Sequence, residues 1–169
     1  RGVWGGGYSP TMNTMEYITI ATIGNAIDFG DLVHTKFATS AVGSPTRGIF
    51  MGGDPNQSKM YYFTFSSSGG TNTFGDLKDN HYNASALSND TRGLSLGGNP
   101  FITSIEYITM ATTGDASSFG DLFDGNRYAA GAASPTRGII GGGIDASTPV
   151  AAKGTKSIQY VTIASKGNS

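Results

Sequence analysis

Short stretches of this chain alternate between apolar and polar residues with a period of two. The clearest stretch is Met15-Glu16-Tyr17-Ile18-Thr19-Ile20, which is also rich in β-branched and aromatic side chains. This pattern is typical of a strand that buries one face. No window longer than about ten residues has a convincing helical period. We therefore expect an all-β fold built from short strands.

The same strand pattern recurs as part of a longer repeat. An Arg-Gly pair, an apolar stretch and a glycine cluster open each unit, at Arg1, Arg47, Arg92 and Arg137. The spacings of 46, 45 and 45 residues divide the chain into repeats 1–46, 47–91, 92–136 and 137–169. The last repeat is incomplete, and the connection after its glycine cluster is eight residues longer than in the others.

Three further features hold fixed places in the repeat. The strand after the glycine cluster carries Tyr17, Tyr62, Tyr107 and Tyr160. Phe-Gly-Asp-Leu follows as a short outer strand or tight turn, with its aromatic residue at Phe29, Phe74 and Phe119. A basic residue before an aromatic one comes next, at Lys36-Phe37, His81-Tyr82 and Arg127-Tyr128. Residues 37–42 and 47–51 flank Gly43-Ser44-Pro45-Thr46 and predict a hairpin.

A unit of about 45 residues with four short strands and a glycine doublet is typical of a β-propeller blade. The repeat resembles the kelch repeat. The glycine doublets Gly52-Gly53 and Gly97-Gly98 and the four strand tyrosines match the kelch pattern, and phenylalanine stands where kelch repeats carry tryptophan. Lys36, His81 and Arg127 stand near the kelch arginine. The resemblance implies an all-β, kelch-like β-propeller, or part of one, with four-stranded blades.

The amino-acid sequence of the repeats is also similar to that of kelch-like repeats in marine bacteriophage structural proteins, especially tail-fibre-like ones. The motifs that carry this resemblance are Glu-Tyr-Ile-Thr-Ile-Ala-Thr, Phe-Gly-Asp-Leu and Ser-Pro-Thr-Arg-Gly. This resemblance implies a virion appendage, hence an extracellular location. It implies other virion proteins or further repeats of the same chain as partners, a host-surface glycan or protein as receptor, and a homo-oligomer as an option.

Most repeated residues have a structural interpretation. The tyrosines and phenylalanines are expected to fill the space between neighbouring sheets. The acidic residue of each Phe-Gly-Asp-Leu segment caps a turn or pairs with the arginine that opens a repeat. The acids are Asp31, Asp76 and Asp121, and the arginines are Arg47, Arg92 and Arg137. Glu16 and Glu106 precede the strand tyrosine and are expected to face solvent.

Composition removes several function classes. The chain has 11 basic and 12 acidic residues, and this balance argues against a nucleic-acid surface. It contains no cysteine, which excludes disulfides, a thiol nucleophile and a cysteine-ligated zinc. The two histidines form no metal-binding spacing, and no pair of acids stands out, so we expect no metal, no cofactor and no catalysis. The sequence contains no run of about 18 apolar residues, so it predicts no membrane-spanning helix.

The loops after the glycine clusters differ most between repeats, and binding residues concentrate on loops held by a rigid scaffold. Aromatic and amide side chains in these loops suit sugar recognition by stacking and hydrogen bonding. The candidate binding residues are Tyr8, Asn13, Asn56, Gln57, Asn99 and Phe101.

The reading favoured by these observations is a non-catalytic structural or adhesion module of a phage virion that binds a host-surface glycan or protein. Three alternatives stay open: a spacer or decoration protein without its own receptor, a propeller-type glycan-active enzyme, and a cellular kelch adaptor. The chain opens at Arg1 and its last unit lacks Phe-Gly-Asp-Leu, so we expect a segment of a longer protein.

Overall fold

The fold is all-β, as the period-two pattern predicts. The computed structural model describes residues 1–55, 58–145 and 154–169, and those ranges contain no helix. The strands are β1 (Gly2–Gly7), β2 (Met12–Ile18), β3 (Ile27–Lys36), β4 (Ser40–Gly43), β5 (Arg47–Met51), β6 (Lys59–Thr64), β7 (Asn72–Asp76), β8 (Ser85–Ser88), β9 (Arg92–Leu96), β10 (Ser104–Thr109), β11 (Ser117–Asp121), β12 (Asn126–Arg127), β13 (Ala130–Ala133), β14 (Arg137–Gly141), β15 (Ile144–Asp145) and β16 (Ile158–Thr162).

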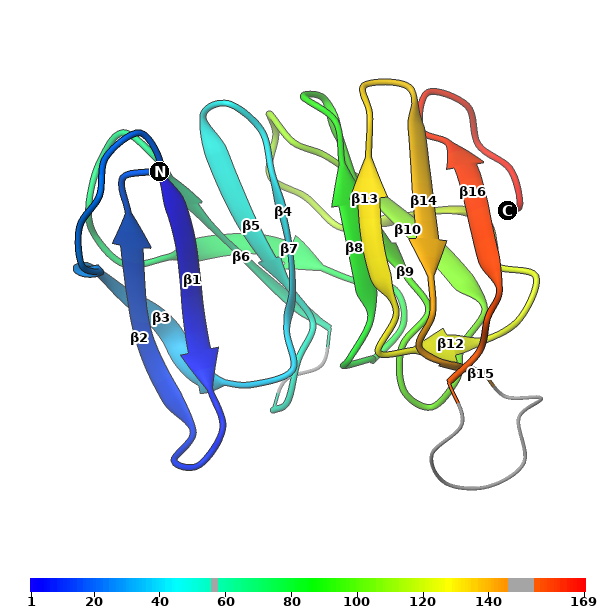
Figure 1. The fold of residues 1–169 in the computed structure, drawn as a ribbon, viewed down its shortest axis with the longest axis horizontal. Coiled ribbons are helices and arrows are strands. Elements are labelled where there is room, and N and C mark those ends of the chain that lie inside the picture. Colours follow the sequence, from blue (N-terminus) through cyan, green and yellow to red (C-terminus); the bar gives the residue numbers. More distant parts are fainter. Residues whose placement is uncertain (56–57, 146–153) are drawn as a thin grey trace.

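Four antiparallel sheets follow one another in chain order, from left to right in Figure 1. The first sheet is β1-β2-β3, the second β4-β5-β6-β7, the third β8-β9-β10-β11 and the fourth β13-β14-β16. The short strands β12 and β15 form a separate pair. No sheet closes on itself, and the two ends of the chain lie at opposite sides of the molecule (Figure 1).

Each repeat gives its last strand to the sheet of the next repeat. Strand β4 lies in the first repeat of the sequence but pairs with β5 of the second, across the predicted turn. The Ser44 amide donates to the Arg47 carbonyl at 2.9 Å and closes this hairpin, whose first strand begins at Ser40 rather than at residue 37. The Phe-Gly-Asp-Leu segments form the outer strands β3, β7 and β11, so the strand alternative was the right one.

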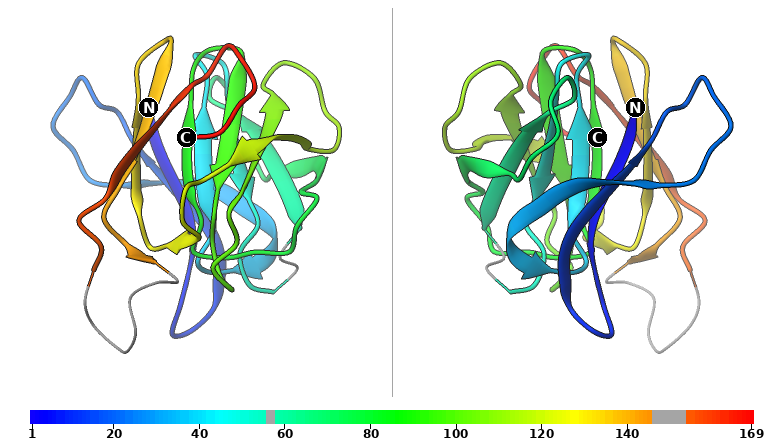
Figure 2. Two further views of the ribbon diagram at one scale, coloured as in Figure 1. Left: turned by 90° about the vertical axis from the view of Figure 1, so that its right-hand side faces the viewer. Right: turned by 90° about the vertical axis from the view of Figure 1, so that its left-hand side faces the viewer.

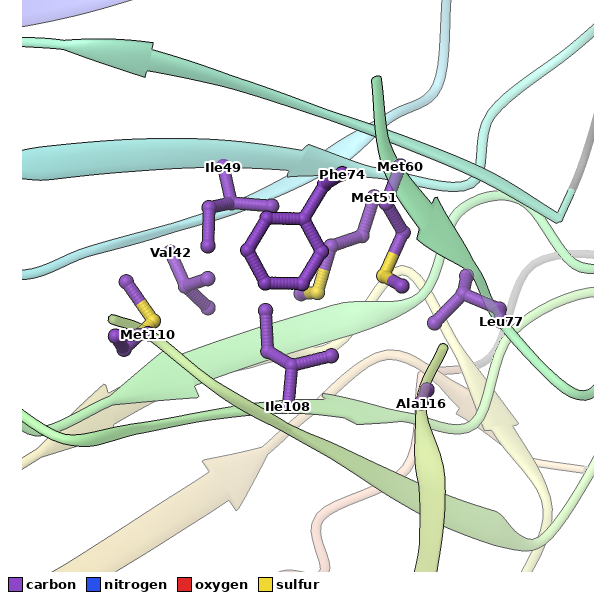
Figure 3. Close-up of a cluster of buried hydrophobic side chains, with 9 residues drawn as sticks. All are labelled: Val42, Ile49, Met51, Met60, Phe74, Leu77, Ile108, Met110 and Ala116. Carbon is purple, nitrogen blue, oxygen red and sulfur yellow. The ribbon is translucent and has the colours of Figure 1, made fainter. Parts of the chain in front are cut away.

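Neighbouring sheets pack face to face through layers of apolar side chains. In β10, Ile105 points toward the fourth sheet and Ile108 toward the second, as the period of two requires. Figure 3 shows the layer between the second and third sheets, where Ile108 and Met110 meet Ile49 and Phe74. The inner sheets are therefore buried on both faces, and only the first and fourth sheets have an open face.

The repeated aromatic residues lie between the sheets, as predicted. The three phenylalanines are buried, and each meets the tyrosine of its own sheet edge-on: Tyr17 with Phe29, Tyr62 with Phe74, and Tyr107 with Phe119. Tyr160 departs from the prediction, because it lies on the open face of the fourth sheet and is exposed.

The repeated arginines do not pair with the repeated aspartates in the described ranges. Each arginine instead lies over the tyrosine ring of its own sheet, at 4.4 Å for Arg47 and Tyr62 and at 4.7 Å for Arg92 and Tyr107. The rings of Tyr17 and Tyr160 hold Arg1 and Arg137 in the same way. The partner of each arginine guanidinium is therefore the face of a tyrosine ring and not an aspartate carboxylate.

Two of the three aspartates bind side chains at the edge of their own sheet. Asp76 accepts a hydrogen bond from Ser58 at 3.3 Å and forms an ion pair with Lys59 at 2.8 Å. Asp121 accepts from Thr103 at 3.3 Å, the corresponding bond in the third sheet. Asp31 stands at the same place on β3 and binds the second sheet through its carbonyl, which accepts from the Thr71 amide. Turn capping and pairing with arginine were thus both wrong for Asp76 and Asp121.

Glu106 is buried, which corrects the expectation that it faces solvent. Its carboxylate accepts hydrogen bonds from the backbone amides of Lys78 and Asp79 at 2.8 and 2.9 Å. Residues of β10 do alternate between the two faces of the sheet, as predicted, but the second sheet covers the face on which Glu106 lies. Glu16 lies on the open face of the first sheet and is exposed, as expected.

The register of the third repeat shifts the basic-aromatic motif by one residue. Phe37 pairs with Asp54, Tyr82 with Asn99 and Arg127 with Ile144. Arg127 therefore corresponds to Phe37 and Tyr82, and Asn126 stands at the place of Lys36 and His81. The sequence match of Arg127 to Lys36 and His81 was wrong by one position.

Candidate functional site

The candidate site is an aromatic depression at the end of the molecule where the β1–β2 turn lies, the lower end in Figure 1. It has a volume of about 580 Å³. Its lining residues, which define the aromatic depression below, are Gly5, Gly6, Gly7, Tyr8, Phe37, Ala38, Thr39, Tyr82, Asn83 and Tyr128. They come from the glycine cluster of the first sheet and from the segments that enter β4, β8 and β13.

The same backbone conformation recurs at three corresponding positions around the aromatic depression. Ala38, Asn83 and Tyr128 lie 45 residues apart and have φ angles of 56°, 56° and 60°. This left-handed region costs an ordinary residue about 1–2 kcal/mol, and Asn tolerates it better than Ala or Tyr. The fold therefore holds these residues in place against their own preference.

Hydrogen bonds between neighbouring segments hold that conformation. The Asn83 amide donates to the Ala38 carbonyl at 2.9 Å, and the Tyr128 amide donates to the Asn83 carbonyl at 3.0 Å. Each segment is thus bonded to the next, so the three side chains are presented in fixed positions. Such preorganisation lowers the cost of ordering a binding surface.

Aromatic rings dominate the walls. Tyr8 and Tyr128 are exposed, whereas Phe37 and Tyr82 are half-buried. The rings of Tyr8 and Phe37 lie 4.9 Å apart at an angle of 54°. Asn83 adds an amide that can both donate and accept hydrogen bonds. Rings with nearby hydroxyl and amide groups suit a ligand that has apolar faces and polar edges, such as a sugar.

A layer of buried polar side chains lies beside the aromatic depression, at the residues that precede Phe37, Tyr82 and Arg127. Lys36 Nζ donates to the Gly52 carbonyl at 2.6 Å, and Asn126 Nδ2 donates to the Gly142 carbonyl at 2.8 Å. At the third position His81 Nε2 hydrogen-bonds to Ser95 Oγ at 2.8 Å. The first two bonds fasten the entering segments to the glycine clusters, and the His81 bond fastens its segment to β9.

Burial governs the charge of this layer. It lowers the pKa of Lys36 to about 8, a shift that nearby Asp54 partly opposes. It lowers the pKa of His81 to about 4, with Asp79 acting in the opposite direction. At neutral pH His81 is therefore neutral, and Lys36 is the one of these two that carries charge. None of the residues that line the aromatic depression is acidic or basic.

Four of the six sequence-predicted binding residues lie in the described ranges, and of these four the structure brings Tyr8 to the aromatic depression. Asn99 and Phe101 are half-buried, and both contact Arg127: Asn99 Oδ1 accepts from its Nη1 at 2.6 Å, and the Phe101 ring lies 4.3 Å from its guanidinium carbon. Asn13 is half-buried within β2, on the strand rather than in the loop. Asn56 and Gln57 lie outside the described residues.

Four lining residues with aromatic or amide side chains were missed as binding candidates: Phe37, Tyr82, Asn83 and Tyr128. Phe37, Tyr82 and Tyr128 are the aromatic residues of the repeated basic-aromatic motif, and Asn83 directly follows it, whereas we had looked for binding residues in the loops that differ between repeats. The available signal was that three of the four carry aromatic rings beside small residues. Repetition places such rings at one end of the molecule, so a framework motif also forms a surface.

A second groove of about 320 Å³ lies between the hairpin turns and is lined by residues 88–91 and 133–135. Its residues are small and polar, apart from Pro135 and Ala133. The Asn89 side chain crosses it and donates to the Pro135 carbonyl at 2.9 Å. The groove lacks aromatic rings, so the aromatic depression is the better candidate for ligand binding.

The described ranges contain no group of three His, Cys, Asp or Glu residues placed to hold a metal ion, and no helix long and apolar enough to cross a membrane. Comparison of the sequence with protein-family models and with curated proteins returned no match.

Proposed function

We propose that this chain is an arc of a kelch-like β-propeller. The order of strands supports this proposal, since each inner sheet is a four-stranded meander whose first strand lies beside the first strand of the next sheet. The sheets pack face to face in chain order, and the kelch-like tyrosines Tyr17, Tyr62 and Tyr107 pack against the apolar layers between them.

We further propose that the arc is a non-catalytic adhesion module of a phage virion appendage and that it binds a host-surface glycan. The observation that carries the binding function is the aromatic depression, whose rings are held by hydrogen bonds between repeats. Its lining offers rings, one amide and hydroxyls, and no carboxylate pair that would hydrolyse a glycosidic bond. The location on a virion rests on the resemblance of the repeats to tail-fibre-like proteins.

The test is binding of the purified chain to immobilised bacterial surface polysaccharides. We expect Tyr8→Ala and Tyr128→Ala each to weaken binding about tenfold or more, as loss of an aromatic anchor does. Tyr160→Ala is the matched control, because Tyr160 and Tyr128 are both 57% exposed but Tyr160 lies on the fourth sheet. Equal losses in Tyr128→Ala and Tyr160→Ala contradict a site at the aromatic depression.

The two main alternatives give different results in the same experiment. A spacer or decoration protein binds none of the polysaccharides, and phage particles with a changed aromatic depression adsorb to their hosts as before. A glycan-active enzyme releases reducing sugar from the polysaccharide during incubation. Binding without release, lost in the two tyrosine variants, supports the adhesion module.

A further inference from the structure

The fourth sheet exposes apolar residues that are buried at the corresponding places of the other sheets. Ile158 is 75% exposed, whereas its equivalents Met60 and Ile105 are fully buried at 0%. Ile139 lies on the same open face at 46%, and its equivalents Ile49 and Leu94 are also at 0%. In the second and third sheets the next sheet along the chain covers these positions. The left panel of Figure 2 faces this end of the molecule.

The first sheet shows the complementary pattern on its opposite face. Ile20 is 72% exposed, whereas its equivalents Met110 and Ile163 are at 1% and 0% because the preceding sheet covers them. Ile18 and Trp4 are exposed on the same face, and their equivalents Val161 and Ile140 are buried. The right panel of Figure 2 faces this end. The molecule therefore ends in two different apolar faces.

An arginine contact identifies how such faces meet inside the molecule. Arg1, Arg47 and Arg92 lie over the tyrosine of their own sheet and donate to a backbone carbonyl of the next, at 2.9, 3.1 and 2.6 Å. The accepting carbonyls belong to the equivalent residues Phe65, Met110 and Ile163. Arg137 lies over Tyr160 in the same way, and no carbonyl accepts from its guanidinium in the described ranges. The equivalent carbonyl on the first sheet is that of Ile20.

We propose that the open face of the fourth sheet binds the open face of the first sheet of a second copy of this chain, head to tail. Ile139 and Ile158 then pack against Ile18 and Ile20 of the second copy. Arg137 donates to the Ile20 carbonyl of the second copy and keeps its contact with Tyr160. The proposal is independent of glycan binding, because the two end faces contain none of the residues that line the aromatic depression.

A second copy is the occupant that the structure favours, because the three internal interfaces already join the same pair of faces. In each internal interface, one sheet contributes the face that is open on the fourth sheet, and the next sheet contributes the face that is open on the first sheet. One arginine and a layer of aliphatic and aromatic residues lie between them. The two faces differ from one another, so the association is heterologous. Heterologous contacts produce rings where the rotation closes and open chains where it does not.

The first test is sedimentation of the 169-residue protein from about 1 µM to about 1 mM, a range that brackets interfaces of modest affinity. We expect the wild type to reach multiples of its 17.5 kDa mass as concentration rises. Ile139→Glu removes one face and Ile20→Glu the other, so each variant alone stays monomeric. A mixture of the two forms a dimer and nothing larger, since one intact face of each kind is left.

The matched control is Phe123→Glu. Phe123 follows β11 of the third sheet, so it lies on neither end face, and its side chain is exposed. Its backbone amide, which donates to Gln159, is kept in the variant. The control is expected to associate as the wild type does, and circular dichroism confirms that all variants keep their strands. A wild type that is monomeric at every concentration overturns the proposal. Self-association of either single variant also overturns it, because that result requires a contact between like faces.

Trp4 provides a second, direct readout. It is the only tryptophan of the chain and lies on the open face of the first sheet. When Ile20→Glu is the only protein present, the Trp4 fluorescence emission is expected to stay at the wavelength of an exposed indole at all concentrations. In Ile139→Glu, addition of Ile20→Glu is expected to shift the Trp4 emission to shorter wavelength, because the second copy covers the ring. A dimer without this shift places the contact elsewhere and contradicts the proposal.

Discussion

Arg92 and Ile163 join the third and fourth sheets through one hydrogen bond: Nη1 of Arg92 donates to the Ile163 carbonyl at 2.6 Å. The same guanidinium lies 4.7 Å from the centre of the Tyr107 ring. A planar cation that stacks and donates at the same time explains why arginine stands at this place in every repeat. Lysine offers a compact ammonium without the planar face and does not replace it fully.

Replacing Arg92 is therefore expected to destabilise the protein more than replacing Arg137. Arg92→Ala removes a half-buried donor and a cation–π contact, at a cost of about 1–3 kcal/mol in the free energy of unfolding. Arg137→Ala removes an exposed group and costs about 0.5 kcal/mol or less. Urea unfolding at low protein concentration measures both values. Equal losses would show that the carbonyl contact adds nothing to the ring contact.

Glu106 is expected to tolerate an amide but not a methyl group. Gln159 stands at the same place in the fourth sheet, and its Oε1 accepts from the Phe123 amide at 2.8 Å. Glu106→Gln retains one acceptor oxygen, and burial raises the pKa of the Glu106 carboxyl, so loss of the charge offsets part of the lost bond. We expect a change within about 1 kcal/mol for Glu106→Gln and a loss of about 1–3 kcal/mol for Glu106→Ala, which leaves two partly buried backbone amides without an acceptor.

Thermal or urea unfolding at neutral pH separates the two Glu106 variants. Glu16→Ala is the control, because Glu16 lies on the open face of the first sheet and accepts from the exposed Trp4 indole. It is expected to change the unfolding free energy by about 0.5 kcal/mol or less. A loss in Glu106→Gln as large as that in Glu106→Ala would contradict the interpretation.

His81 is expected to make stability fall in mild acid. Burial lowers its folded pKa to about 4, below the ordinary value of 6.5. Between these values the unfolded chain binds a proton that the folded chain does not, so the contribution is complete above pH 6.5 and is lost as the pH falls toward 4. At about 1.4 kcal/mol for each unit of difference, the loss is of the order of 3 kcal/mol.

The measurement for His81 is the pH dependence of unfolding of His81→Asn compared with the wild type. Asn126 occupies the corresponding place in the third repeat, so an asparagine fits there. The comparison cancels the carboxylates, which titrate in both proteins. His34→Asn, at an exposed histidine, is expected to follow the wild-type curve. A wild type and His81→Asn with parallel curves from pH 4 to 7 would exclude His81 as the source of acid sensitivity.

The glycine of Phe-Gly-Asp-Leu is required by the neighbouring sheet. A methyl group on Gly75 would overlap the carbonyl of Gly114, and one on Gly30 would overlap that of Gly69. The added methyl group is attached to one backbone and meets the backbone of the neighbouring sheet, so no flexible side chain can move aside. Gly75→Ala is therefore expected to lower the free energy of unfolding by about 1–3 kcal/mol. Gly24→Ala is the control in urea unfolding, since a methyl group there meets nothing within 4 Å.

The strands were predictable because the period of two and the 45-residue repeat are local features. The hairpin around Ser44 and the outer Phe-Gly-Asp-Leu strands follow from turn residues and from recurrence. The burial of Glu106 was not predictable in the same way, because it depends on a second sheet covering a face that looks polar in the sequence. The exposure of Tyr160 has the same origin, since no further sheet covers it in this structure.

The aromatic depression was predicted only at Tyr8. The other rings, such as Phe37 and Tyr128, lie in a motif that recurs in three of the four repeats, and we had looked for binding residues in the loops that differ between repeats. The pairing of Arg127 with Ile144 also shows why Tyr128 was misplaced, since spacing by residue type shifted the match by one. Cross-strand register settles such a shift, and a single sequence does not show it.

The arrangement of contacts has a consequence for how such genes change. The apolar layers among the described residues join each sheet to the sheets next to it in the chain, so removal or duplication of 45 residues between equivalent Arg-Gly pairs rejoins the same two faces. Exchange between misaligned copies of the repeat then lengthens or shortens the array without creating a foreign contact, whereas an exchange out of register by part of a unit breaks a sheet. We expect natural variants of this chain to differ in length by whole multiples of the repeat.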